Sequence, residues 1–238
     1  MKMIVMHMSG AYLPQNFFMK KEVIELDCRN IQGTNCYLDD EAKDELRQRI
    51  APCEAEDVHF LDSGNYHYLS LLWLEKIEKP FSLVLFDHHP DMQPPSFGQI
   101  TSCGGWVLEA LETLPHLQRV YMVGVDEKLF CQLESHPKVQ LGLDGIGEDA
   151  NPVYVSFDKD VLSKEDAVCD WDQGEMTLKG ALDILGQIKE KHSFIGMDVC
   201  GEDSKWQESV TEEKTIAINE TTNGILLEFW ENINRIEK

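Results

Sequence analysis

Short apolar runs that end directly in acids or histidines most restrict how this chain can fold. The segments SLVLF (82–86) and VYVSF (153–157) are almost continuously apolar, as strands buried on both faces of a sheet are. Asp-His-His-Pro-Asp follows the first run and Asp-Lys-Asp follows the second. An aspartate also follows directly after the runs VHFL (58–61) and FIGM (194–197). Sites in parallel α/β sheets gather at the carboxyl ends of the strands, so these polar residues are candidates for one site.

Strand-like and helix-like segments alternate along the chain, which indicates a mainly parallel sheet with helices on both faces. We therefore predict an α/β fold, a three-layer α/β/α sandwich. We expect a single domain over residues 1–238, because no Pro/Gly/Ser-rich linker divides the sequence. The predicted strands are 3–7, 23–26, 57–61, 82–87, 119–123, 153–157 and 194–198. The predicted helices are 40–49, 68–77, 104–114, 178–190 and 212–234.

Charge and composition argue against several kinds of partner. The formal net charge is −22, whereas nucleic-acid-binding surfaces are basic, so no nucleic-acid partner is expected. No segment approaches the roughly 20 apolar residues of a membrane helix, and the N-terminus does not resemble a secretory signal. Seven cysteines without a CxxC pair indicate reduced thiols and a cytoplasmic protein. An acidic site would attract a cationic small molecule.

The acids and histidines that follow two of the runs have the spacing of metal ligands. Asp87, His89 and Asp91 alternate, so their side chains converge if the backbone stays extended. Asp158 and Asp160 repeat that spacing after another strand. Four carboxylates buried together would repel one another, and a pair of divalent cations removes that cost. One DxD alone is more often a loop or a helix cap, but DxHxD and DxD together favour a metal site.

Three segments resemble motifs of the arginase/agmatinase/formimidoylglutamase (ureohydrolase) family, of which this chain would be a short, divergent member. FDHHPD (86–91) resembles the family's DAHxD motif, with His88 in place of the usual alanine. SFDKDVL (156–162) resembles SxDxDxxDP, and SGNYHYLS (63–70) resembles GGDHS. The family has a three-layer α/β/α fold with a binuclear manganese site. The resemblance therefore implies a hydrolase of this fold.

The resemblance also implies a set of metal ligands and a reaction. Two Mn²⁺ ions, or other divalent metals, would be bridged by Asp87 and Asp158. A hydroxide that bridges the ions would attack the planar carbon of a guanidino or amidino compound and cleave a C–N bond. The substrate would be a small, cationic molecule. The six implied metal ligands are His67, Asp87, His89, Asp91, Asp158 and Asp160.

Three residues are candidates for catalysis by the same resemblance. Asp91 would orient the hydroxide. Glu202 would hold the substrate cation, although it lies one residue beyond the expected position after Asp198, and it could equally be a solvated loop acid. Many arginases have a catalytic histidine in the loop after DAHxD; here the stretch 101–106 has none, and Cys103 or a neighbour takes its place.

Other interpretations stay open on the sequence alone. Amide deacetylases share the broad fold but use one zinc ion with two aspartates and one histidine, together with paired catalytic histidines. The missing loop histidine also fits a metal-binding protein without turnover. Met92-Gln93 lacks the asparagine that holds an amino-acid substrate in arginases, which argues against arginine. His88 is expected to support the site from outside or to pack in the core. Homo-oligomers are common in the family, and no feature here decides the assembly.

Overall fold

The centre of the protein is an eight-stranded sheet. The computed structural model describes residues 2–19, 21–95, 98–208 and 212–235. The strands lie in the order β2-β1-β4-β10-β9-β5-β7-β8, and each neighbouring pair in this sheet is parallel. Their bounds are β1 Met3–His7, β2 Val23–Asp27, β4 Val58–Phe60, β5 Phe81–Phe86, β7 Leu117–Val123, β8 Val139–Leu141, β9 Val153–Asp158 and β10 Phe194–Cys200. The predicted parallel α/β fold is confirmed.

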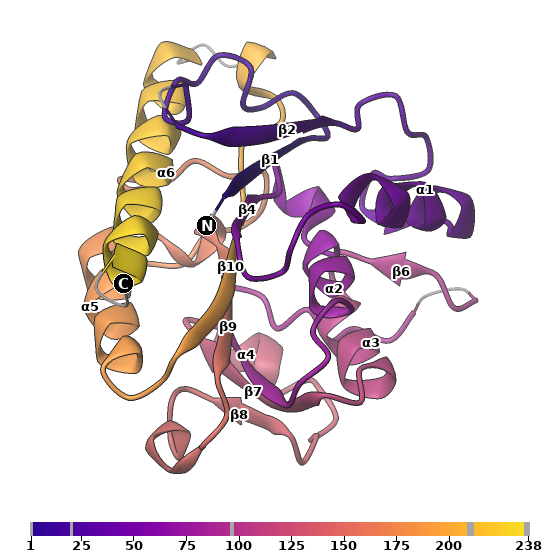
Figure 1. Cartoon of the computed structure of the whole chain (residues 1–238), viewed down its shortest axis with the longest axis vertical. Helices are drawn as coiled ribbons and strands as arrows, with labels where there is room; N and C mark the ends of the chain where they lie inside the picture. Colours follow the sequence, from indigo (N-terminus) through magenta and orange to yellow (C-terminus); the bar gives the residue numbers. More distant parts are fainter. Residues whose placement is uncertain (1, 20, 96–97, 209–211, 236–238) are drawn as a thin grey trace.

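Helices cover both faces of the sheet, so the protein has three layers. Figure 1 shows α5 and α6 on one side and α1, α2 and α3 on the other. The α-helices are α1 Asp40–Ile50, α2 Leu69–Leu74, α3 Trp106–Thr113, α4 Glu127–Phe130, α5 Leu178–Lys189 and α6 Glu212–Arg235. The 3-10 turns are η1 Gly64–Tyr66, η2 Ile146–Glu148, η3 Lys159–Val161 and η4 Trp206–Glu208. Within the described ranges, no helix has the length and apolar character needed to span a membrane.

The central strands are apolar throughout because each of their faces packs against a helical layer. Leu83 and Leu85 of β5 join the hydrophobic cluster under α1, α2 and α3. Val84 and Phe86, which alternate with them, join the cluster under α5 and α6. Burial of one such side chain stabilises the fold by roughly 1.5–3 kcal/mol. The continuous apolar runs in the sequence therefore follow from burial on both faces.

Several elements differ from the predicted ones. Helix α2 is shorter than the predicted 68–77, because after Leu74 the chain tightens into i→i+3 bonds from Lys76 N to Trp73 O and from Ile77 N to Leu74 O. Helix α3 begins at Trp106 and not at residue 104, since two glycines precede it. Strand β8, helix α4 and a small antiparallel ribbon were not predicted. That ribbon consists of β3 Tyr37–Leu38 and β6 Thr101–Ser102.

The strand order brings four polar segments to one edge of the sheet. Strands β4, β10, β9 and β5 are consecutive neighbours in the middle of the sheet. All run in the same direction, so the residues that follow them emerge side by side at their carboxyl ends. These segments are 62–67 after β4, 201–202 after β10, 158–160 at the end of β9 and 87–91 after β5.

The buried His59 of β4 makes the stability of the fold sensitive to acid. Its ring stacks on Trp73 at 3.7 Å between centroids, donates from Nε2 to Glu54 O at 2.9 Å, and lies 3.1 Å from the Tyr154 hydroxyl through Nδ1. Burial lowers the pKa of His59 from 6.5 to about 3. Above pH 6.5 both the folded and the unfolded state hold it neutral. Between pH 6.5 and about 3 mainly the unfolded state binds the proton, so stability falls as the pH falls.

We expect this histidine to cost roughly 2 kcal/mol of unfolding free energy between pH 6.5 and pH 4.5. Urea unfolding at a series of pH values measures the slope. The variant His59→Gln, which keeps a donor and an acceptor but does not titrate, should show a flatter profile over this range. Equal slopes in the two proteins would mean that His59 does not control acid stability.

Candidate metal centre

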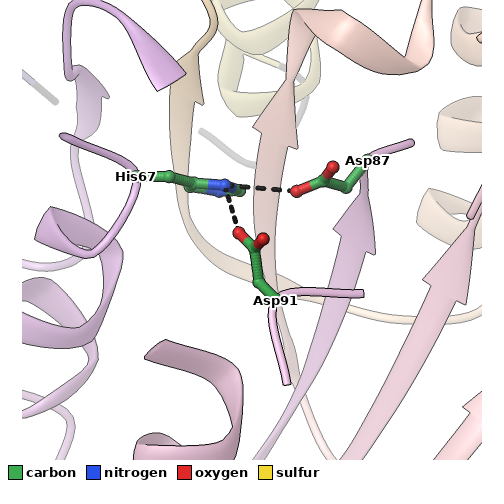
Figure 2. A group of neighbouring side chains, drawn as sticks. All are labelled: His67, Asp87 and Asp91. Atoms are coloured by element: carbon green, nitrogen blue, oxygen red, sulfur yellow. Dashed lines mark ion pairs between the residues drawn. The ribbon is translucent and has the colours of Figure 1, made fainter. Parts of the chain in front are cut away.

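A buried imidazole lies against carboxylates from two other strands. His67 follows β4 through η1, and its Nδ1 lies 3.2 Å from Asp87 Oδ2 and 3.0 Å from Asp91 Oδ2 (Figure 2). The same nitrogen lies 3.5 Å from Asp158 Oδ2. Neighbouring ligands of one ion, each bound at about 2.1 Å, lie about 3 Å apart. The atoms of His67, Asp87 and Asp91 therefore have the spacing of ligands to one ion.

A second cluster shares Asp87 with the first. His89 Nδ1 lies 2.8 Å from Asp160 Oδ2 and 3.6 Å from Asp87 Oδ1. Asp87 thus directs Oδ2 towards His67 and Oδ1 towards His89. A carboxylate whose two oxygens face two groups of donors is arranged to bridge two ions. The structure brings all six sequence-predicted ligands together. Asp158 lies beside His67 but belongs to neither of the two clusters.

The backbone after β5 curls instead of remaining extended. The strand ends at Phe86, His89 N donates to Asp87 Oδ1 at 2.6 Å, and Asp91 has a left-handed φ of 47°. Our prediction that these side chains converge on an extended backbone was therefore wrong. Asp91 instead turns back and is held by Trp106 Nε1, which donates to its Oδ2 at 2.8 Å. A positive φ at a residue other than glycine is strained and is often found at functional sites.

A chain of hydroxyl groups orients His67. Ser156 Oγ donates to Asp198 Oδ1 at 2.7 Å, so its own lone pairs are available to His67 Nε2 at 2.9 Å and to Ser70 Oγ at 3.1 Å. The bond between His67 and Ser156 holds a proton on Nε2, so Nδ1 is the ring nitrogen that faces the carboxylates. Sequence reasoning missed Ser70, Ser156, Asp198 and Trp106 as supports, although Ser156 is the serine of the SxDxD motif.

The electrostatics of the cluster call for positive charge. Burial, together with the nearby Asp160 and Asp87, raises the pKa of Asp158 well above its usual value. Burial and the Asp87 carboxylate raise the pKa of Asp160 to about 7, and burial also raises the pKa of Asp91. These carboxylates share one buried volume with the imidazole of His67, whose Nδ1 faces them. Divalent cations would remove both the mutual repulsion and the desolvation cost, so the donor set fits two such ions.

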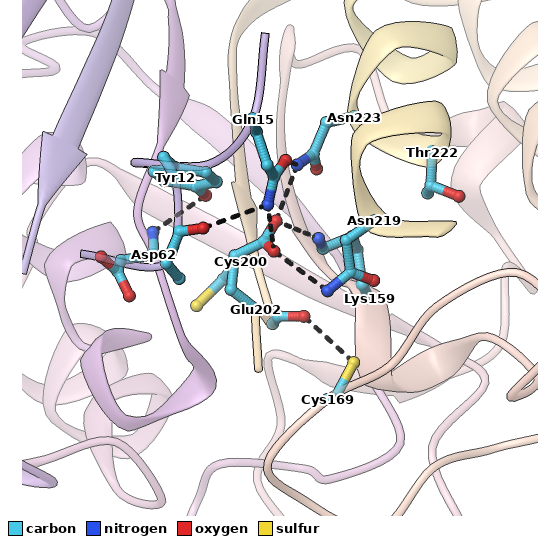
Figure 3. Close-up of polar contacts among 12 residues, drawn as sticks. Tyr12, Gln15, Asp62, Lys159, Cys169, Cys200, Glu202, Asn219, Thr222 and Asn223 are labelled. Carbon is cyan, nitrogen blue, oxygen red and sulfur yellow. Dashed lines mark hydrogen bonds and ion pairs between the residues drawn. The ribbon is translucent and has the colours of Figure 1, made fainter. Parts of the chain in front are cut away.

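Glu202 is occupied inside the protein and does not line the cavity. Its carboxylate is 1% exposed and forms an ion pair with Lys159 (Figure 3). It also accepts from Gln15 Nε2 at 2.8 Å, Asn219 Nδ2 at 3.0 Å and Asn223 Nδ2 at 2.7 Å. The alternative of a solvated loop acid is wrong, because the group is buried. Its setting also differs from the substrate-holding role that the resemblance implies, since its oxygens already have four partners.

The position before Glu202 has no room for a side chain. Gly201 has φ +88°, and a β-carbon there would stand 2.4 Å from Asp158 Oδ1 and 2.8 Å from Lys159 N. This is the position at which the resemblance leads us to expect a cation-binding carboxylate. The close approach of the chain after strand β10 to Asp158 and Lys159 therefore excludes that carboxylate.

Cys103 lines a cavity of about 540 Å³ whose floor includes the six candidate ligands. Burial raises the pKa of the Cys103 thiol, so at neutral pH this group stays protonated. The backbone N of Cys103 donates to Cys36 O at 2.9 Å, next to the β3–β6 ribbon.

The ring of His88 lies edge-on to that of His89, and the backbone N of His88 donates to Asp160 Oδ1 at 2.9 Å. His88 thus contacts the candidate ligand Asp160 through its backbone and not through its ring.

Comparisons with known proteins connect this arrangement to solved structures. The sequence matches no family profile. An uncharacterized protein of Thermotoga maritima is 34% identical over 166 residues, which are 68% of this chain and 65% of that relative. A hypothetical agmatinase of Burkholderia thailandensis superposes with a TM-score of 0.62 at 16% identity, over 100% of this chain and 87% of its own. Native arginase of Bacillus caldovelox gives 0.61 at 15% identity, over 93% and 96% of the two chains. At such identities the likeness shows a common fold.

Proposed function

We propose that this chain, which has the arginase fold, is a metal-dependent hydrolase that cleaves a C–N bond of a guanidino or amidino compound. The observation that supports this function best is Asp87, which directs one oxygen to each of two clusters of carboxylate and imidazole groups. Hydrolases of this class need two adjacent cations, and a shared carboxylate is the usual device for holding them.

The proposed occupants are two Mn²⁺ ions. One ion would be held by His67, Asp87, Asp91 and Asp158. Asp87 and Asp158 would also bind the second ion, together with His89 and Asp160. When bound, such ions lower the pKa of a coordinated water and polarise the carbon under attack.

Residues of the chain supply the remaining steps. Asp91, fixed by Trp106 Nε1, orients the attacking water and accepts its proton at a carboxylate oxygen. Ser156 and Asp198 keep the imidazole of His67 in the tautomer that presents Nδ1. The buried position of these groups excludes bulk water from the reacting carbon.

Amide deacetylation is the weaker candidate. That chemistry is implied to use one zinc ion and a further pair of histidines as acid and base. The described lining of the cavity includes two histidines, His67 and His89, and each belongs to one of the two clusters. This leaves the described wall without a histidine pair for acid–base work.

Metal content and product release test the proposal together. The purified chain is loaded with Mn²⁺ and crystallised, and diffraction is measured at the manganese absorption edge. Urea and ammonia release is then measured on a series of guanidino and amidino compounds. We expect two ions about one carboxylate and turnover of at least one compound. A single bound ion per chain would favour the deacetylase, and two ions without turnover would favour a non-catalytic protein.

Two adjacent histidines offer a matched comparison. His89→Ala removes the Nδ1 that lies 2.8 Å from Asp160. Because this removes a direct ligand, we expect a loss of more than about 100-fold in affinity for the second ion and a similar loss of turnover. His88→Ala leaves the backbone bond to Asp160 in place and should change both quantities by less than about threefold. Titration with Mn²⁺ measures the affinities. Equal losses in the two variants would contradict the assignment of His89.

A further inference from the structure

The wall of the cavity above the candidate ligands is mostly apolar. The cavity of about 540 Å³ has the size of a pocket for a small organic molecule. Apart from the candidate ligands, the described residues that line it include neither a lysine nor an arginine, and neither an aspartate nor a glutamate. The large apolar side chains of this wall include Tyr37, Ile100, Leu129, Leu133 and Trp171.

Trp171 is a fixed aromatic wall next to the ligands. Its indole Nε1 donates to Asn65 Oδ1 at 2.9 Å, and its ring lies edge-on to His89 at 6.0 Å. It packs so closely on Gly64 that a β-carbon there would come within 2.9 Å of its Cδ1. Although it is anchored in this way, 43% of Trp171 is exposed. An apolar group in the cavity would cover this surface, and removal of apolar surface from water favours binding.

The rest of the wall comes from elements that the fold adds around the site. Leu129 lies in α4, and Leu133 follows that helix. The residue before α4 holds it to segment 87–91, since Asp126 N donates to His88 O at 3.0 Å. Tyr37 comes from the small β3–β6 ribbon and is 41% exposed. Aromatic and aliphatic surfaces from separate segments therefore face one cavity.

A charged substrate tail would have no described partner in this wall. A primary amine or a carboxylate that leaves water without an opposite charge loses solvation that nothing replaces. The −22 net charge of the chain attracts a guanidinium head over long range, but it provides no contact for a charge on the tail. Gln93, Gln132 and Ser102 supply only neutral hydrogen-bonding groups.

We infer that the substrate of this site is a guanidino or amidino compound with an uncharged alkyl or aromatic tail. The inference rests on the proposed function for its reacting head. Its tail is argued from the wall alone. The apolar wall thus selects against amino-acid, amine and acid tails, and Trp171 and Tyr37 pack against the tail that is accepted.

Three compounds that differ only in the charge of the tail test this inference. They are butylguanidine, agmatine with its terminal amine, and 4-guanidinobutyrate. Urea release gives kcat/KM for the manganese-loaded chain, and calorimetry gives Kd. We expect butylguanidine to exceed both charged compounds about tenfold or more in each measurement. Trp171→Ala should reduce kcat/KM for 2-phenylethylguanidine about tenfold, with most of the loss in KM.

The outcomes separate the two proposals. Tighter binding of butylguanidine without turnover of any compound would support the uncharged tail and overturn the hydrolase. Equal or better binding of agmatine or 4-guanidinobutyrate would overturn the uncharged tail, whether or not turnover occurs, and so would the absence of binding by all three compounds. Gln132→Glu and Gln132→Lys add opposite charges at an exposed position of the wall. The first should shift the preference towards agmatine, and the second towards 4-guanidinobutyrate.

Discussion

Asp87→Ala is expected to remove both metal ions from the protein and to reduce hydrolysis on the order of 10³-fold or more. Loss of a group that merely supports a ligand costs 10–100-fold in affinity or activity, and Asp87 contacts both clusters directly. The purified variant should contain less than one equivalent of manganese, measured by elemental analysis after dialysis. Hydrolysis is measured at saturating Mn²⁺, so that a loss caused only by weaker binding can be recognised.

Asp160→Ala is the matched control for this variant. Asp160 contacts His89 and lies in only one of the two clusters. It should therefore cost one ion and leave the ion near His67 in place. If Asp87→Ala retained two ions with unchanged affinity, the bridging role of Asp87 would be refuted.

Lys159→Met is expected to lower the free energy of unfolding by roughly 3–5 kcal/mol, which is the usual cost of removing one partner of a buried ion pair. The Lys159 side chain is fully buried, and its Nζ pairs with Glu202. Without the ammonium, Glu202 would keep only amide donors, from Gln15, Asn219 and Asn223. Urea unfolding in the presence of a chelator measures this change without a contribution from metal binding.

The double variant Lys159→Met/Glu202→Gln separates charge from packing. It removes both charges and keeps similar side-chain volumes, so we expect it to recover more than half of the lost stability. The single variant Glu202→Gln should be destabilised as well, because it leaves Lys159 buried and unpaired. A single Lys159→Met variant within about 1 kcal/mol of the original protein would show that the ion pair contributes little.

The sequence was most informative where burial or repetition left a pattern. The continuous apolar runs of β5 and β9 predicted a buried parallel sheet, and the fold that the motifs led us to expect is shared with solved structures of arginase and agmatinase. The residues that follow the central strands come together because parallel neighbours end at one edge. This placement needed only the strand positions and the rule for parallel sheets.

Short elements and distant contacts escaped prediction for physical reasons. Strands β3 and β6 have two residues each and α4 has four, too few for a period to be visible. The partners of Glu202 lie as far as 187 residues away, at Gln15, and no local pattern encodes such a pairing. The left-handed turn at Asp91 and the bond that its carboxylate accepts from Trp106 are features that a period-two pattern cannot anticipate.

The carboxylate of Glu202 also joins segments that lie far apart in the sequence. It accepts bonds from Gln15, near the start of the chain, and from Asn219 and Asn223 in α6, the last helix. Lys159, which lies between two candidate ligands, is held by the same carboxylate. The support of residues 158–160 therefore depends on contacts between distant parts of the sequence. The proposed metal site is complete only when these segments have closed around one buried anion.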